Sequence, residues 1–257
     1  MEIPIKTGRF APRDYSRQRS VLFSPHAPLR ACGGYCVVQP SSDPILWEVD
    51  VQVDFLHPGG KLYIPGAEKL IPNIQRLVDV ARRNGALLIS SGDRHPPDDP
   101  EFKVFPPHCV RGTRGAEVVP EGLAQRICTL PNDPKVQLPK NLLDHQQIFI
   151  EKQTLDVFDN PHTEKVLERL PLDAEFLVFG VVTEYCVRCA ASGLLNRGRR
   201  VYIISDAIEH LNSAAGSETI DELTAAGAEL ISTAEAVTRL NAKKSDNPEA
   251  SGHHPIL

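Results

Sequence analysis

The sequence predicts an α/β domain with three layers, α/β/α, built on a mainly parallel, doubly wound sheet. From Ile45 onward, apolar runs of strand length alternate with segments of helical period, the pattern of a parallel sheet covered on both faces. Charged residues directly follow several of these runs, and the carboxyl ends of parallel strands are where such folds bind ligands. The chain has 257 residues, 41% of them hydrophobic, which is enough for one large core.

The elements follow one another in a regular order. Strands are expected over 45–50, 86–91, 147–151, 175–182, 200–205 and 228–232. Helices are expected over 67–84, 184–197, 214–226 and 233–240, the first ending at Asn84-Gly85 and the second at Gly198. Two long irregular segments, 51–66 and 92–146, interrupt this order, and long loops in a compact domain are usually functional.

The chain divides into three parts. Residues 1–43 form an extension of uncertain structure, rich in Arg, Pro, Ser and Gly, and residues 44–241 form the catalytic domain. Residues 242–257 are a polar tail. The Arg and Ser content of the extension faintly suggests a transit peptide, but Glu2, Asp14 and many prolines weaken that interpretation.

Charge and hydropathy exclude several classes of partner. The formal net charge is −5 and no Lys/Arg run stands out, so nucleic acid is not expected to bind. No apolar stretch is long enough to span a bilayer, and the N-terminus lacks the order of a secretory signal. We therefore expect a soluble, cytoplasmic protein whose partner is a small molecule, and leave open whether it is a homo-oligomer.

The cysteines are too sparse for a disulfide scaffold. There are six of them in the chain, and Cys32 with Cys36 makes a CxxxC pair without a second matching pair. Four are interpreted as reduced structural thiols rather than metal ligands: Cys32, Cys36, Cys109 and Cys128. This leaves Cys186 and Cys189 to be judged by their context.

Three residues at strand ends make a candidate catalytic set. Cys186 follows the most apolar strand in the first turn of a predicted helix, where the positive helix end favours a thiolate nucleophile. Asp50 ends another strand and can exchange the thiol proton with a leaving amine. Lys152 closes a third strand and can keep these charges ionised. Taken singly, each has an ordinary alternative: a core cysteine, a capping aspartate and a surface lysine.

A second cluster has the composition of a metal site. Asp93 and His95 form a D-x-H motif at a strand end, and His108 follows two stiffening prolines, with Glu101 between them. This mixed N/O donor set suits zinc, iron or manganese better than calcium. The alternative is a set of histidines on a loop surface. His57 is a weaker candidate for the same neighbourhood.

Several motifs occur together in a fixed order. They are DVQVDF from Asp50, DRH from Asp93, FPPHC from Phe105, EK at Glu151 and GVVTEYCV from Gly180. With these motifs the chain resembles the isochorismatase-like cysteine hydrolases, and among them the nicotinamidases, from Ile45 to about Leu240. Separate motifs in matching order are far harder to obtain by chance than one alone.

The resemblance implies a function for each motif. It makes Cys186 the nucleophile, Asp50 the general base and then acid, and Lys152 their electrostatic support. It also implies a cis peptide between Val181 and Val182, with the backbone N–H groups of Val182 and Cys186 forming the oxyanion hole. The expected reaction is hydrolysis of nicotinamide to nicotinate and ammonia through a thioester.

The resemblance further implies one divalent ion that orients the pyridine ring, with Zn²⁺ expected and Fe²⁺ or Mn²⁺ as alternatives. Its ligands would be Asp93, His95 and His108, with Glu101 as a further candidate. Three aromatic residues are expected to wall the substrate pocket: Phe55, Phe105 and Tyr185. The chain departs from the pattern at Arg94, where relatives often carry an aromatic residue, and it has no third histidine before His108.

Other functions remain open at this point. The nearest alternative is another amidase of the superfamily, acting on an N-carbamoyl or ureide-type substrate, which would keep the catalytic set but usually lack the metal ligands. Isochorismate hydrolysis fits less well, because that branch need not retain the cysteine. A catalytically silent binding protein on the same fold is a further alternative, since a fold does not determine function.

Overall fold

The computed structural model describes residues 43–242. Cys32, Cys36, nearly all of the expected N-terminal extension and all but the first residue of the polar tail lie outside these residues, so those boundaries remain predictions. Among the described residues, no helix is both long enough and apolar enough to cross a membrane.

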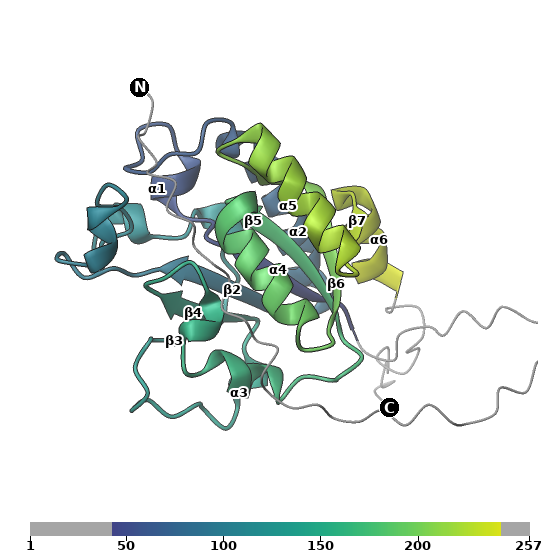
Figure 1. Ribbon diagram of the computed structural model, residues 1–257. Coiled ribbons are helices and arrows are strands. Elements are labelled where there is room, and N and C mark those ends of the chain that lie inside the picture. Colours follow the sequence, from purple (N-terminus) through teal and green to yellow (C-terminus); the bar gives the residue numbers. More distant parts are fainter. Residues whose placement is uncertain (1–42, 243–257) are drawn as a thin grey trace, which may run out of the picture.

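A single parallel sheet of seven strands forms the middle layer, in the order β3-β4-β2-β1-β5-β6-β7 (Figure 1). The strands are β1 (Ile45–Val49), β2 (Leu88–Asp93), β3 (Ile127–Leu130), β4 (Gln147–Lys152), β5 (Glu175–Val181), β6 (Arg200–Glu209) and β7 (Glu229–Ile231). The chain begins at the centre of the sheet with β1 and adds β2, β4 and β3 on one side. It then returns to the centre with β5 and adds β6 and β7 on the other side. The predicted three-layer, doubly wound fold is confirmed.

Helices cover both faces of the sheet. They are α1 (Val53–Leu56), α2 (Ile71–Asn84), α3 (Thr163–Leu167), α4 (Arg188–Leu195), α5 (Ser213–Ala225) and α6 (Thr233–Ala242). Leu77 of α2 and Leu240 of α6 pack in one core with alternate strand residues such as Leu46. Leu194 of α4 and Leu223 of α5 pack in the other core. Figure 1 shows α4 crossing in front of the sheet.

Alternation along β1 explains how one strand serves both cores. Leu46 faces the α2 side, whereas Trp47 and Val49 face the α4 side, where the Trp47 ring meets Phe176 edge-on with centroids 5.8 Å apart. All five residues of β1 are buried. A strand buried on both faces is nearly continuously apolar, which is why 45–50 could be identified from sequence.

The structure differs from the predicted elements in several places. The segment 51–66, expected to be irregular, contains the short helix α1, α3 was not predicted, and β2 covers Leu88–Asp93 rather than 86–91. The segment 92–146, expected to be irregular throughout, contains the edge strand β3, whose exposed Ile127 and Thr129 gave it no apolar signature. β6 extends to Glu209, beyond the predicted end at residue 205. The helix expected over 184–197 begins with a π-helical turn, Thr183–Val187, before α4 starts at Arg188.

Strand order brings four chain segments together at one edge of the sheet. β4, β2, β1 and β5 are consecutive neighbours, and in a parallel sheet their carboxyl ends lie side by side. Lys152 and Asp93 are the last residues of β4 and β2 and are register partners. Asp50 follows β1, and the turn that contains Cys186 follows β5.

Candidate active site

Lys152 is the centre of the cluster at the carboxyl edge of the sheet. Its Nζ lies 2.8 Å from Asp50 Oδ2 and 2.5 Å from Asp93 Oδ1, and donates to Cys186 Sγ over 3.4 Å. The side chain is 1% exposed, so these contacts replace almost all of its hydration. The structure therefore brings the three predicted catalytic residues together. Lys152 is not the surface lysine of the alternative interpretation.

Asp50 is held by local structure as well as by charge. Its backbone adopts a φ of 52°, a left-handed conformation that aspartate tolerates better than most residues. Its N–H donates to Ser91 O over 3.0 Å, and Ser91 Oγ donates to Asp50 Oδ1 over 3.3 Å. Burial raises the pKa of Asp50 to about 6, against the opposing attraction of Lys152. A carboxyl with this pKa can accept and return a proton near neutral pH.

The expected thiolate at Cys186 is not what the geometry favours. Cys186 is the fourth residue of the π-helical turn and is 6% exposed. Burial raises the pKa of its thiol well above the ordinary value, and the Asp50 carboxylate raises it further. Loss of hydration, which raises the pKa of the thiol, outweighs the lowering of that pKa expected from a nearby helix end. Burial therefore favours the protonated thiol at Cys186, and its proton must move to Asp50 for the sulfur to attack.

Asp93, His95 and His108 converge beside this cluster. Asp93 Oδ2 lies 3.6 Å from His95 Nε2 and 3.5 Å from His108 Nε2, and all three side chains are buried. Although burial opposes ionisation of Asp93, Lys152 and the two imidazoles hold the pKa of Asp93 well below its ordinary value. One donor atom from each residue lies within 4.8 Å of the others. An anionic oxygen and two imidazole nitrogens at this spacing are a fitting donor set for a divalent transition metal.

The other nitrogen of each imidazole is occupied, which leaves Nε2 as the ligand atom. His108 Nδ1 pairs with Pro106 O at 2.8 Å, and His95 Nδ1 pairs with Asp99 Oδ2 at 3.0 Å. The buried His95 Nε2 has no hydrogen-bonding partner within residues 43–242. Hydrogen bonds of this kind fix the tautomer and ring orientation of histidines that bind metals. Asp99 was not identified from the sequence, although it lies four residues after His95.

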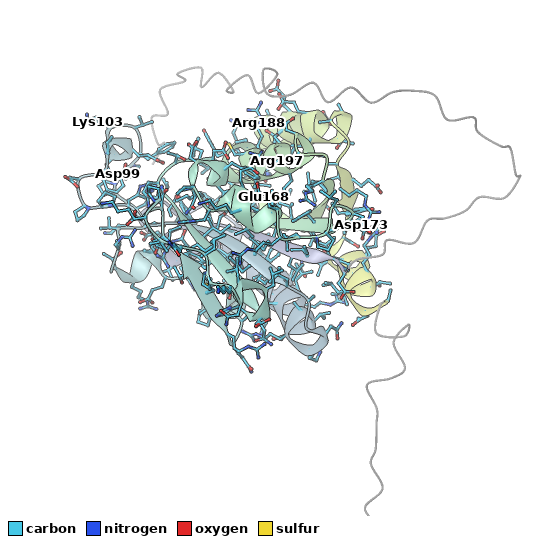
Figure 2. All side chains as sticks on the ribbon, turned by 90° about the horizontal axis from the view of Figure 1, so that it is seen from below. Asp99, Lys103, Glu168, Asp173, Arg188 and Arg197 are labelled. Atoms are coloured by element: carbon cyan, nitrogen blue, oxygen red, sulfur yellow. The ribbon has the colours of Figure 1, made fainter. Side chains whose placement is uncertain are left out.

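Glu101 lies outside the group formed by Asp93, His95 and His108. It forms a group with His95 and Asp99 rather than with the three-residue group that contains Asp93. Asp99 positions it, because Asp99 Oδ1 accepts the Glu101 backbone N–H at 2.9 Å. Asp99 and Lys103, which flank Glu101, lie at the opposite end of the molecule from Asp173 (Figure 2). The role of Glu101 as a ligand stays a prediction.

Aromatic rings surround the two histidines. The ring of Phe55 lies 5.4 Å from that of His108, and Phe105 lies 6.3 Å from both His108 and Tyr185. All three predicted wall residues are thus near the site. Phe102, which sequence reasoning missed, lies 5.3 Å from the ring of His95 and 5.9 Å from that of His108. Its position next to Glu101 in the ligand loop was the available signal.

Three further predictions have a structural outcome. The Val181–Val182 peptide bond is cis, as the resemblance implies. His57 does not join the metal-ligand group; it lines a different pocket, together with Arg94 and Arg114. Cys109 and Cys128 are free thiols, and Cys109 is fully buried, in agreement with their interpretation as structural cysteines.

Comparisons with known proteins agree with this arrangement. The chain is 27% identical over 213 residues to the nicotinamidase of Escherichia coli K12, a match that covers 73% of this chain and 93% of that protein. A crystal structure of Pyrococcus horikoshii pyrazinamidase in complex with zinc superposes with a TM-score of 0.60 at 27% identity, covering 74% of this chain and 99% of that one.

A second solved structure shows similarity of fold. It is the N-carbamoylsarcosine amidase of Thermoplasma acidophilum, at 23% identity and a TM-score of 0.59, covering 75% of this chain and 97% of that one. The model of the isochorismatase domain family matches residues 45–130 and 128–235, which include every residue of the site described above. The chain therefore belongs to the isochorismatase family.

Proposed function

We propose that the protein is a metal-assisted nicotinamidase, which hydrolyses nicotinamide to nicotinate and ammonia through a thioester on Cys186. The family and its curated nicotinamidases make it a hydrolase of amide C–N bonds. The narrower assignment is carried by one observation: the buried group of Asp93, His95 and His108 lies directly beside the cluster of Lys152, Asp50 and Cys186. We propose Zn²⁺ as the ion, which would supply an anchor for the pyridine nitrogen.

The first half of the reaction transfers the acyl group to the enzyme. The thiol proton of Cys186 passes to Asp50, and the sulfur attacks the carboxamide carbon. We place the resulting oxyanion at the backbone N–H groups of Val182 and Cys186, which follow β5 at the edge of the sheet. Asp50 then protonates the amine, so that ammonia leaves and a thioester remains on Cys186.

The second half regenerates the thiol. Asp50, again a carboxylate, takes a proton from water, and the hydroxyl group adds to the thioester carbon. The carbon–sulfur bond breaks, Asp50 returns its proton to sulfur, and the carboxylic acid product leaves and gives up its own proton to water. Lys152 stays protonated throughout, since the two carboxylates raise its pKa well above the ordinary value despite burial. Its charge stabilises Asp50 and the sulfur anion alternately.

The shape of the site favours a flat ring. Phe55 and Phe105 face His108, and Tyr185 meets Phe105 edge-on, with their ring planes at 90°. Aromatic side chains at such angles present faces and edges between which a pyridine ring can pack.

The expected cytoplasmic location remains a prediction, as does any homo-oligomer.

The nearest alternative is an amidase of the same superfamily with an N-carbamoyl substrate. It shares the catalytic cluster, and the N-carbamoylsarcosine amidase shares the fold. Such an enzyme has no need of an ion that anchors a ring nitrogen, so a mild preparation containing well under one metal ion per chain would favour it. The buried Nε2 of His95, which lacks a hydrogen-bonding partner among residues 43–242, favours the metal-binding alternative.

Purified, metal-loaded protein is expected to release ammonia from nicotinamide. Cys186→Ala removes the nucleophile and should abolish turnover, whereas Cys189→Ala, one helical turn away, should retain it. Ammonia release and nicotinate formation are measured on the same samples. The proposal fails if metal-loaded wild type turns over neither nicotinamide nor pyrazinamide, or if Cys186→Ala keeps its activity.

The pH profile should report Asp50. Because Asp50 must be ionised to accept the thiol proton, and its pKa is raised to about 6, kcat/KM for nicotinamide should be constant above that pH. Below it, kcat/KM should fall about tenfold per pH unit as the carboxyl becomes protonated. The profile is measured alongside circular dichroism to confirm that the protein stays folded. A flat profile through roughly pH 5 with folded protein would contradict the role of Asp50.

Asp99 should control metal affinity through His95. In Asp99→Asn the carboxylate that orients His95 is lost, and Zn²⁺ affinity is expected to fall by about 10–100-fold. Competition with a chromophoric chelator measures the affinity without any substrate. Asp98→Asn is the matched control, because Asp98 is its exposed neighbour in sequence. Equal Zn²⁺ affinities in the two variants would show that the contact between Asp99 and His95 does not support the ion.

A further inference from the structure

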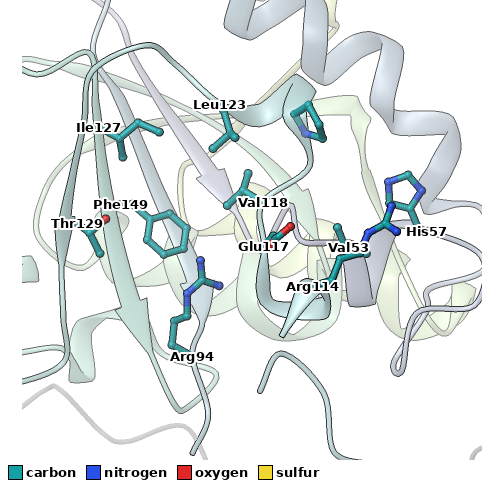
Figure 3. Close-up of a pocket in the computed structure, with 11 residues that line it drawn as sticks. Val53, His57, Arg94, Arg114, Glu117, Val118, Leu123, Ile127, Thr129 and Phe149 are labelled. Carbon is teal, nitrogen blue, oxygen red and sulfur yellow. The ribbon is translucent and has the colours of Figure 1, made fainter. Parts of the chain in front are cut away.

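A second pocket, of about 420 Å³, lies apart from the catalytic cluster (Figure 3). Its lining includes neither the catalytic residues nor the metal-ligand group: Val53, His57, Arg94, Arg114, Glu117, Val118, Pro120, Leu123, Ile127, Thr129 and Phe149. Phe149 of β4 and Thr129 of β3 are register partners and form one wall. Val118 and Leu123, from the segment between β2 and β3, form another.

Arg94 is the residue at which this pocket approaches the active site. It lies between the candidate ligands Asp93 and His95 in sequence, yet its side chain extends to the other pocket and lies over the Phe149 ring, with Cζ 4.8 Å from the centroid. In Figure 3 its guanidinium is next to the Phe149 ring.

The charge of Arg94 is only partly compensated. Its Nη1 donates to the carbonyl oxygens of Asp93 and Ala116, which are neutral acceptors. The nearest carboxylate oxygen, Glu151 Oε1, is 3.9 Å from Nε, and the other oxygen of Glu151 is engaged by Arg111 at 2.9 Å. The hydrogen bonds that Arg94 donates within residues 43–242 come from Nη1. The side chain is 19% exposed, so water solvates this cation only in part.

The rest of the lining favours a ligand with an apolar body. Phe149 lies next to the Arg94 guanidinium in Figure 3, Val118 and Leu123 line the same pocket, and the exposed Ile127 extends this apolar lining. Arg114 and His57 add basic groups at the other side of the pocket, while the exposed Glu117 is the one acidic side chain in the lining. An anionic head and a flat apolar body match this combination of a fixed guanidinium and a hydrocarbon wall.

We propose that this pocket is a second ligand site, which binds a small monocarboxylate with an aromatic body. The carboxylate accepts from Nη2 of Arg94, and the ring packs against Phe149 and Leu123. Arginine is suited to this contact because its planar guanidinium binds a carboxylate while stacking on an aromatic ring. The site is distinct from the catalytic cluster, and its ligand binds without being turned over.

Benzoate is a suitable probe for calorimetric titration of the full-length, metal-loaded protein. Arg94→Met keeps the length of the side chain but removes its charge, and Thr129→Trp fills the pocket from the wall that Thr129 shares with Phe149. Each is expected to weaken benzoate binding by about tenfold, and uncharged benzyl alcohol should bind wild type more weakly by a similar factor. Arg111→Gln is the matched control: it removes a positive charge beside the same Glu151 but does not line the pocket.

The outcomes separate this site from the active site. Loss of binding in Arg94→Met and Thr129→Trp, with wild-type affinity in Arg111→Gln, supports the proposal. Affinity unchanged by Thr129→Trp but lost in His108→Ala would place benzoate at the catalytic cluster and overturn it. Equal losses in Arg94→Met and Arg111→Gln would indicate a general charge effect, which also overturns it. Because binding is measured directly, the result does not depend on nicotinamidase activity.

Discussion

The buried ammonium group of Lys152 is the interaction on which the rest of the site depends. It compensates two carboxylates, Asp50 and Asp93, that are themselves almost fully buried, and it also contacts the sulfur of Cys186. Isolated charges at such depth would be too costly to retain. With Lys152 in place, burial leaves Asp50 a base of moderate strength and Cys186 a protonated thiol, so that proton transfer between them becomes part of the reaction.

Asp93 joins the catalytic cluster to the metal-ligand group. Its Oδ1 contacts Lys152, while its Oδ2 faces His95 and His108. The Asp93 carboxylate thus belongs to both the catalytic cluster and the metal-ligand group. The register pairing of Asp93 with Lys152 fixes the distance between the two groups. A substrate anchored at the histidines would therefore be presented to Cys186 in a defined orientation, which is what the proposed hydrolysis of a flat carboxamide requires.

Sequence reasoning was most successful where chemistry coincides with strand ends. Asp50, Asp93 and Lys152 could be selected because parallel strands bring their carboxyl ends together, and the aromatic walls followed from resemblance. Asp99 and Phe102 were missed because their contacts with His95 depend on the path of a loop without periodicity. β3 was missed because an exposed edge strand lacks an apolar pattern. The expectation of a resting thiolate left out burial, which raises the pKa of the Cys186 thiol and which a sequence does not reveal for a single cysteine.

The free energy of unfolding of charge variants tests the central role of Lys152 most directly. Lys152→Met should destabilise the protein by about 3–5 kcal/mol, because it leaves two buried carboxylates without a counterion. Adding Asp50→Asn to Lys152→Met should recover part of this loss by removing one of the uncompensated charges. Lys61→Met, at an exposed position, is the control for loss of a positive charge. If Lys152→Met is as stable as Lys61→Met, the ammonium does not hold the site together and the account is contradicted.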